Sequence, residues 1–164
     1  MIIEYGVENV VYVDECGVNQ HLFREYARAK RGVKIHATKS GKRFKRVNVI
    51  GAKWGKRHIA VRCYRHTTTS EFFEDWFEFK LIPLLPCGTV IVMDNARFHR
   101  KETLIKIAEH YGIAILFLPP YSPDYNLIEN SWANLKTWLK DNIVDYTYPE
   151  WAIYDYFNGV PILF

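Results

Sequence analysis

The sequence is poor in the residues that build disulfide frameworks and structural zinc sites. Its three cysteines, Cys16, Cys63 and Cys87, are odd in number, lie far apart and form no C-x-x-C pair. This pattern argues against a structural zinc site and indicates reduced thiols. We therefore expect a cytoplasmic protein.

Long hydrophobic runs are absent as well. No apolar run approaches 18 residues, so no segment is predicted to span a membrane, and the first residues reach Glu4 too soon for a signal peptide. Hydrophobic residues make up 49% of the chain and aromatic residues 16%, which indicates a globular protein. The 164 residues are enough for one buried core and too few for two ordinary domains, so we expect a single domain over residues 1–164.

Acidic residues are nearly missing from one part of the chain. From Arg24 to Arg65 the only acid is Glu25, although the formal net charge of the whole chain is only +4. A solvated surface usually mixes both signs, so this imbalance favours a phosphate polyanion, double-stranded DNA, as the partner. The residues expected to hold phosphates without reading bases are Arg28, Lys30, Arg31, Lys42, Arg43, Lys45 and Arg46.

Hydrophobic periodicity predicts an α/β domain. Apolar runs predict strands over 9–17, 89–94 and 113–119, and residues 46–64 predict an antiparallel hairpin turning at Gly55. Right-handed crossovers then give a mixed five-stranded sheet with helices on both faces. Trp54 in the hairpin is either a core residue or a platform on which a base stacks. The expected helices cover 68–81, 100–111 and about 123–140.

Helix details are predicted from the same patterns. Thr68 and Glu71 are spaced as a capping box. The helical face over 100–111 places Tyr111 inward beside Leu104 and Ala108, and the stripe of the last helix starts at Tyr125. The rest of that stripe is Ile128, Trp132, Leu135 and Leu139.

Three acids are placed where elements end or begin. Asp14 and Asp94 each end an apolar strand, so both are expected at the carboxyl edge of the sheet, where open α/β sheets place their sites. Glu129 borders the buried stripe of a helix whose start is restricted by Pro119, Pro120 and Pro123. Clustered carboxylates repel unless a cation intervenes, and hard divalent ions prefer oxygen ligands. The acids therefore predict a two-metal site for phosphoryl displacement.

Three segments resemble the signature blocks of mariner-type DDE transposases, especially their bacterial insertion-sequence relatives. They are VDECG at 13–17, MDNARFH at 93–99 and LPPYSPDYNLIENSW at 118–132. The 34 residues between Asp94 and Glu129 also agree with the spacing common in that superfamily. The resemblance runs from about Val11 to Lys140, with all three blocks in order.

The resemblance implies a ribonuclease-H-like catalytic domain. Asp14, Asp94 and Glu129 would bind two Mg²⁺ or Mn²⁺ ions, nick DNA at element ends, and promote attack by the freed 3′-hydroxyl on target DNA, usually at TA dinucleotides. Asn95 and His99 match the second block and are expected to line the site; the alternative for His99 is a locally satisfied residue at a helix start. Glu15 and Asp124 are further acids expected beside the site as neighbours.

Family practice also implies a homodimer assembled on DNA. Family members carry an upstream helix-turn-helix module, and no such pattern precedes Asp14, so we expect a catalytic domain whose end recognition comes from a separate module. Cys16, Tyr125 and Leu127 depart from the residues usual in the blocks. These departures leave the three acids intact and predict changed packing near the last helix.

Two other functions compete with this one. Asp14, Glu15 and Asp94 could form the single-Mg²⁺ pocket of a receiver-like signalling domain, which predicts an all-parallel sheet. A catalytically silent transposase remnant would keep the fold and bind DNA without cutting it. Metal-dependent nicking of plasmid DNA distinguishes an enzyme from such a remnant.

Overall fold

The described part of the chain forms one mixed β-sheet with the strand order β3-β2-β1-β4-β5. This computed structural model describes residues 7–19, 45–120 and 122–157. The β1–β2 and β2–β3 pairs are antiparallel, whereas β1–β4 and β4–β5 are parallel. The predicted α/β fold is confirmed, and the all-parallel sheet of a receiver-like domain is excluded. The strands are β1 (Val10–Val18), β2 (Val47–Trp54), β3 (Arg57–Tyr64), β4 (Val90–Met93) and β5 (Ala114–Phe117).

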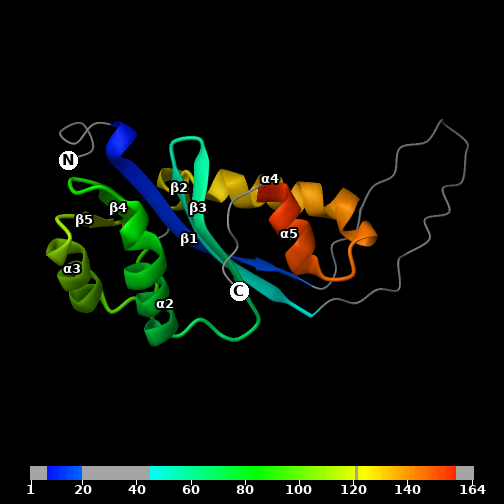
Figure 1. The fold of residues 1–164 in the computed structure, drawn as a ribbon, viewed down its shortest axis with the longest axis horizontal. Helices are drawn as coiled ribbons and strands as arrows, with labels where there is room; N and C mark the ends of the chain where they lie inside the picture. The colour runs from blue at the N-terminus through cyan, green and yellow to red at the C-terminus, as the bar shows by residue number, and fades with distance from the viewer. Residues whose placement is uncertain (1–6, 20–44, 121, 158–164) are drawn as a thin grey trace, which may run out of the picture.

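Helices follow the strands in the order that the sequence predicts, with one more at the C-terminal side (Figure 1). Within the described ranges, none of them combines the length and apolarity needed to cross a bilayer. The α-helices are α2 (Ser70–Trp76), α3 (Lys101–His110), α4 (Glu129–Asn142) and α5 (Pro149–Phe157). Shorter turns are η1 (Val7–Asn9), the π-helical η2 (Phe77–Leu81), η3 (Ile82–Leu84), η4 (Pro123–Tyr125) and η5 (Ile143–Asp145).

The pleat of β1 sends alternate side chains into two hydrophobic layers. Val11 and Val13 pack in a layer with residues of α2 and α3, whereas Cys16 and Val18 pack in a second layer with residues of α4 and α5. The sheet therefore lies between two sets of helices, as predicted.

The hairpin is present as predicted, but the cap of the next helix is shifted by one residue. Gly55, with a φ of 59°, lies in the turn between β2 and β3. The side chain that caps α2 is Thr69, whose hydroxyl accepts the N–H of Phe72 at 3.3 Å. The Thr68 hydroxyl instead lies 2.7 Å from the Tyr64 hydroxyl. Because the Thr68 hydroxyl contacts Tyr64 of the hairpin, it does not cap the helix. The predicted Thr68 cap is wrong.

The last predicted helix begins later than expected. Residues 123–125 form the separate turn η4, and α4 begins only at Glu129. Tyr125 is consequently 69% exposed and lies outside the buried stripe. Tyr111 was also placed inward, yet it is 44% exposed because α3 ends one residue earlier, at His110. The predicted residues that are buried are Leu104, Ala108, Ile128, Trp132, Leu135 and Leu139.

Candidate active site

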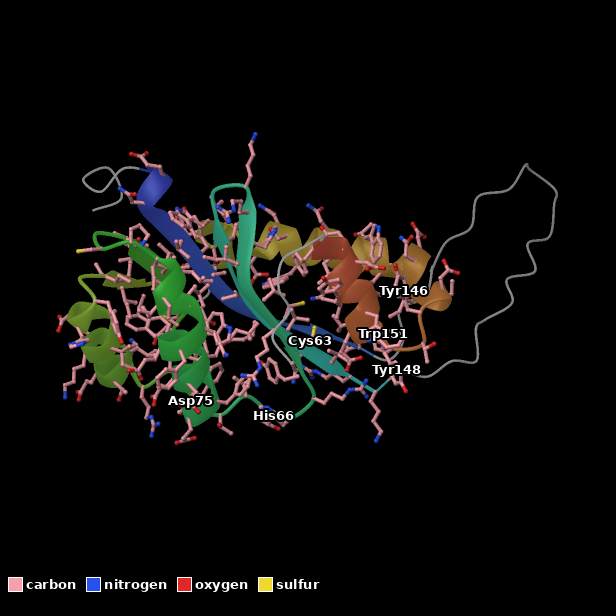
Figure 2. The ribbon with its side chains drawn as sticks, in the orientation of Figure 1. Cys63, His66, Asp75, Tyr146, Tyr148 and Trp151 are labelled. Atoms are coloured by element: carbon pink, nitrogen blue, oxygen red, sulfur yellow. The ribbon has the colours of Figure 1, made fainter. Side chains whose placement is uncertain are left out.

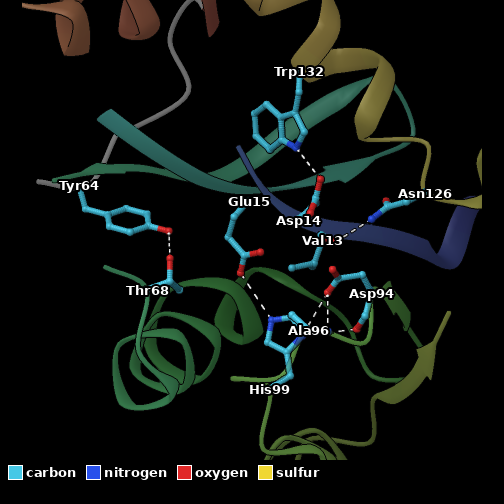
Figure 3. Close-up of polar contacts among 10 residues, drawn as sticks. All are labelled: Val13, Asp14, Glu15, Tyr64, Thr68, Asp94, Ala96, His99, Asn126 and Trp132. Carbon is cyan, nitrogen blue, oxygen red and sulfur yellow. Dashed lines mark hydrogen bonds and ion pairs between the residues drawn. The ribbon is translucent and has the colours of Figure 1, made fainter. Parts of the chain in front are cut away.

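Asp14 and Glu15 are neighbours on β1 but face opposite sides of the sheet. Asp14 lies on the α4 side, where the indole Nε1 of Trp132 donates a hydrogen bond to its Oδ2 at 3.0 Å (Figure 3). Glu15 lies on the other side, where its Oε1 is 3.5 Å from Nε2 of His99. The two acids cannot therefore point into the same pocket.

A glycine opposite Asp14 makes room for the tryptophan. Gly51 is paired with Asp14 across the β1–β2 ladder. A Cβ at Gly51 would lie 3.3 Å from Cη2 of Trp132 and 3.2 Å from a methyl group of Val61. The bare backbone at Gly51 thus lets the Trp132 ring lie against the sheet, with its N–H directed at Asp14. Sequence reasoning placed Trp132 in the core but missed this hydrogen bond.

Burial raises the pKa of the Asp14 carboxyl from 3.8 to about 8. Loss of solvation is the largest cause, and repulsion from Glu15, Glu129 and Asp94 adds to it. The ionised form of Asp14 is therefore disfavoured in the absence of a compensating cation.

Asp94 directly follows β4, beside Asp14, because Val13 and Met93 are register partners in the parallel β1–β4 pair. Its Oδ1 accepts the backbone N–H of Ala96 at 3.2 Å. The Nδ1 of His99 lies 3.3 Å from the same oxygen and 3.4 Å from the Asp94 carbonyl oxygen. The Asp94 side chain remains about half exposed. It is thus held on one side and open to solvent on the other.

His99 is buried between Asp94 and Glu15. Its side chain is only 2% exposed and packs against Phe73, with ring centroids 4.3 Å apart. Nε2 of His99 and Oε1 of Glu15 are both buried without a hydrogen-bond partner, since their separation of 3.5 Å is too long for a good hydrogen bond. The imidazole therefore lies between the two carboxylates and is within 3.3 Å of Asp94 alone. The hydrogen bond of the imidazole to the Asp94 carbonyl oxygen is local, as in the alternative of a histidine satisfied at its helix start, and the role of His99 in lining the site stays a prediction.

Two side chains anchor the loop before Glu129. Asn126 is buried, and its Nδ2 donates a hydrogen bond to the carbonyl oxygen of Val13 at 3.1 Å, next to Asp14. Lys53 donates from Nζ to the carbonyl oxygen of Leu127 at 3.2 Å. The N–H of Glu129 then bonds to the Asn126 carbonyl oxygen at 3.0 Å. These ties to the sheet interrupt the expected helix and place Glu129 at the first residue of α4.

The three carboxylates approach one another without forming a closed metal cage. Asp94 and Glu129 are near enough to Asp14 for their charges to raise its pKa. Among residues 7–19, 45–120 and 122–157, however, no group of three or more His, Cys, Asp or Glu side chains is arranged to hold a metal ion. The donor set nevertheless fits Mg²⁺ or Mn²⁺, because carboxylate oxygens are hard ligands.

The other predicted site residues make no contact with the three acids that the described residues show. Asn95 follows Asp94 and is exposed, and Asp124 is exposed in η4; their roles beside the site stay predictions. Trp54 is partly buried, and its Nε1 donates to the Glu8 carbonyl oxygen at 2.6 Å, which supports its core alternative. Lys45 and Arg46 are exposed before β2. The expected DNA-binding residues that lie outside the described residues are Arg28, Lys30, Arg31, Lys42 and Arg43.

A family model identifies the family of this chain, and solved structures identify its fold. The family described as DDE superfamily endonuclease matches residues 9–146, most of the chain. No curated protein matches. The fold is similar to a Mos1 transposase paired-end complex with the left transposon end, with a TM-score of 0.67 and 15% identity, covering 94% of this chain and 49% of that chain. The chain thus spans about half the length of that transposase.

Two isolated catalytic domains are also similar. The catalytic domain of Mos1 mariner transposase has a TM-score of 0.59 and 13% identity, with 94% of this chain and 73% of that chain covered. The catalytic core domain of BIV integrase has a TM-score of 0.53 and 12% identity, with 90% and 79% covered. The predicted ribonuclease-H-like fold is therefore confirmed.

Proposed function

Because the chain belongs to the DDE superfamily of endonucleases, we propose that it is the catalytic domain of a DNA transposase. It hydrolyses phosphodiester bonds at element ends and joins the freed 3′-hydroxyl to target DNA. The observation that carries this proposal is Asp14, a partly buried carboxyl near Asp94 and Glu129 whose pKa is raised to about 8. Such a group costs free energy when ionised, and a divalent cation offsets that cost.

The proposed metal ligands are Asp14, Asp94 and Glu129, which would hold two Mg²⁺ or Mn²⁺ ions. When bound, a pair of divalent ions activates the attacking oxygen and stabilises the leaving oxygen of an in-line phosphoryl displacement. Asp14 must lose its proton for this binding, because a metal ligand has to be deprotonated. Trp132 keeps Oδ2 of Asp14 in one orientation, and His99 does the same for Asp94.

The partner that the proposal requires is double-stranded DNA, contacted at element ends and at the target. The basic segment that includes Lys45 and Arg46 supports it, since cationic side chains bind phosphates irrespective of sequence. We further propose a homodimer on DNA, with a separate module that reads the element ends. A cytoplasmic, nucleoid-associated location in a prokaryote is consistent with this activity.

Nicking of supercoiled plasmid DNA tests the proposal. The wild-type chain should nick the plasmid with Mg²⁺ or Mn²⁺ and not with EDTA, while Asp94→Ala should lose at least about 100-fold in rate because it removes a metal ligand. Asp75→Ala, an exposed acid on α2 (Figure 2), is the matched control and should keep the wild-type rate. Joining is tested with a labelled oligonucleotide whose 3′-hydroxyl is present or replaced by hydrogen.

Each outcome distinguishes the enzyme from a silent remnant. Loss of nicking in Asp94→Ala, with thermal stability and DNA affinity kept, supports the metal-dependent enzyme. Nicking that survives Asp94→Ala refutes the assignment of the site. A wild-type chain that binds DNA but never nicks it, with either metal, identifies the remnant.

A further inference from the structure

Arg46 lies directly against the backbone of Gly17 at the end of the β1–β2 pair. Gly17 is paired with Asn48 across the antiparallel ladder, and Arg46 lies just before β2. A Cβ at Gly17 would be 2.6 Å from Nη2 of Arg46 and 3.1 Å from both its Cζ and its Nε. The guanidinium group therefore occupies space that any side chain at Gly17 would fill.

A second contact orients the guanidinium group. The Nε of Arg46 donates a hydrogen bond to Oδ1 of Asn48 at 3.1 Å. The Nδ2 of Asn48 in turn donates to the carbonyl oxygen of His66 at 2.9 Å, on the segment that leaves β3 (Figure 2). Because both ends of the amide are engaged, Asn48 presents a fixed acceptor to Arg46. A guanidinium has five N–H donors, so four remain on its two terminal nitrogens.

Arg46 lies near the candidate active site but on the face of the sheet opposite to Asp14, because Gly17 and Glu15 share one face of β1. Gly17 is three residues beyond Asp14 on β1, which corresponds to about 10 Å along a strand. The parallel partner β4 ends opposite Val13, so β1 extends past it toward Gly17. The rise in the pKa of Tyr64 includes opposing effects of Glu15 and Arg46, which places both charges near that hydroxyl.

We propose that Arg46, which lies against Gly17 and is oriented by Asn48, is a preformed contact for one DNA phosphate near the end of β1, on the face of the sheet that carries Glu15. An arginine fork binds phosphate bidentately, and a guanidinium held in place loses little rotamer entropy on binding. Lys45 is the contrasting neighbour, because an ammonium on a flexible stem binds phosphate as a point charge. The inference rests on the proposed function, since it assumes a DNA substrate.

Gly17→Ala gives the most specific test. The clashing atom is the far end of a flexible side chain, so the variant should fold like the wild type while Arg46 is displaced. Binding is measured by fluorescence anisotropy on a labelled 30-base-pair duplex in EDTA, over a range of salt concentrations, with circular dichroism melts as the folding check. Both Gly17→Ala and Arg46→Gln should weaken binding about 5- to 10-fold, and Arg46→Gln should lower the salt slope by about one.

The double variant and two comparisons make the test decisive. Gly17→Ala combined with Arg46→Gln should bind no more weakly than Arg46→Gln alone, because both changes remove one contact. The loss of DNA affinity caused by Lys45→Gln should add to the loss caused by Gly17→Ala, because the two changes affect different contacts. Asn48→Ala provides a second route to the same loss, in case Gly17→Ala folds poorly.

The results that would refute the Arg46 contact differ from those that would refute the proposed function. Wild-type affinity in Gly17→Ala and Asn48→Ala would overturn the preformed contact while leaving a nicking enzyme intact. An Arg46→Gln variant with a lower melting temperature and an unchanged salt slope would instead identify Arg46 as a counter-ion for Glu15. A wild-type chain with no affinity for DNA would refute the proposed function itself.

Discussion

Replacing Asp14 by asparagine measures how much free energy of unfolding is lost when the Asp14 carboxyl ionises in the folded protein. The Asp14 carboxyl has a pKa of about 8 in the folded protein and an ordinary value of 3.8. Between these two pH values the folded chain holds a proton that the unfolded chain has released. The free energy of unfolding therefore falls as pH rises from about 4 to about 8, and this contribution is constant outside that window. Asparagine carries no charge at any pH, so Asp14→Asn lacks this dependence.

The size of the effect follows from proton linkage. One extra bound proton in the folded state gives a slope of about 1.4 kcal/mol per pH unit. Between pH 5 and pH 7 the upper limit is about 2.7 kcal/mol, which we reduce to about 2 kcal/mol because the side chain is partly exposed and solvent screens its charge. For a domain of this size, 1 kcal/mol shifts the Tm by about 2–4 °C. The wild-type Tm should thus fall about 4–8 °C more than that of Asp14→Asn.

Thermal melts in EDTA at pH 5, 6 and 7 provide the assay. The substitution is conservative, because the asparagine oxygen can still accept the hydrogen bond from Trp132. Adding Mn²⁺ at pH 7 should raise the Tm of the wild type and not that of Asp14→Asn. Calorimetry in two buffers of different ionisation enthalpy should report about one proton released per site loaded at pH 7. Parallel melting curves of wild type and variant across this pH range would refute the reasoning.

Two more substitutions test how the carboxylates are positioned, with Mn²⁺ affinity measured by electron paramagnetic resonance. His99→Asn places an amide nitrogen where Nδ1 contacts Asp94, so its Mn²⁺ affinity should stay near that of the wild type. His99→Gln keeps only the contact with Glu15, so its Mn²⁺ affinity should fall about 10-fold. An equal loss of affinity in both variants would contradict a role of His99 in holding Asp94. Asn126→Ala removes a buried hydrogen bond and should lower both the free energy of unfolding, by about 1–2 kcal/mol, and Mn²⁺ affinity. The exposed control Asn134→Ala should change neither; an unaltered Asn126→Ala would refute the anchoring role.

The sheet could be predicted from sequence because its signals are local. The apolar run ending at Asp94 corresponds to β4, and the alternation around Gly55 corresponds to the β2–β3 hairpin. The run ending at Asp14 is part of β1, but β1 continues to Val18, so the prediction that Asp14 ends its strand is wrong; pairing with β2 extends the strand past the end of β4. Each of these patterns follows from the regular alternation of side chains along a strand, which is visible in a few neighbouring residues. Adjacency of Asp14 and Asp94 then follows from pairing of the two strands.

The start of α4 could not be predicted, because it is decided by contacts distant in sequence. Helical periodicity continues through Tyr125, so nothing local indicates a break there. The break comes from Asn126, whose amide reaches Val13 over 113 residues of sequence separation. The one signal available was an asparagine at a position that proved to be buried, and buried amides nearly always have a hydrogen-bond partner.

The contact between His99 and Glu15 was likewise beyond sequence reasoning. Both residues were expected near the site, and the resemblance indicated nothing about how they touch. Their contact depends on α2 and α3 closing over one face of the sheet, with Phe73 against the imidazole. Side chains from three elements have to be placed before this contact exists. The contact of the Arg46 guanidinium with the backbone of Gly17 could not be predicted either, because it too joins residues of different elements.

The alternation of side chains along β1 places the adjacent acids Asp14 and Glu15 in different surroundings. Since successive side chains point to opposite faces, Asp14 shares its face with Trp132 and α4, whereas Glu15 reaches His99. Their charges still interact across the strand, and Glu15 is the strongest of the acids that raise the pKa of Asp14. Glu15 therefore affects Asp14 through its charge, from the opposite face of the sheet. A shift of one residue in the β1–β2 register would exchange the faces of the two acids, so the register decides which of them lies beside Trp132 and which beside His99.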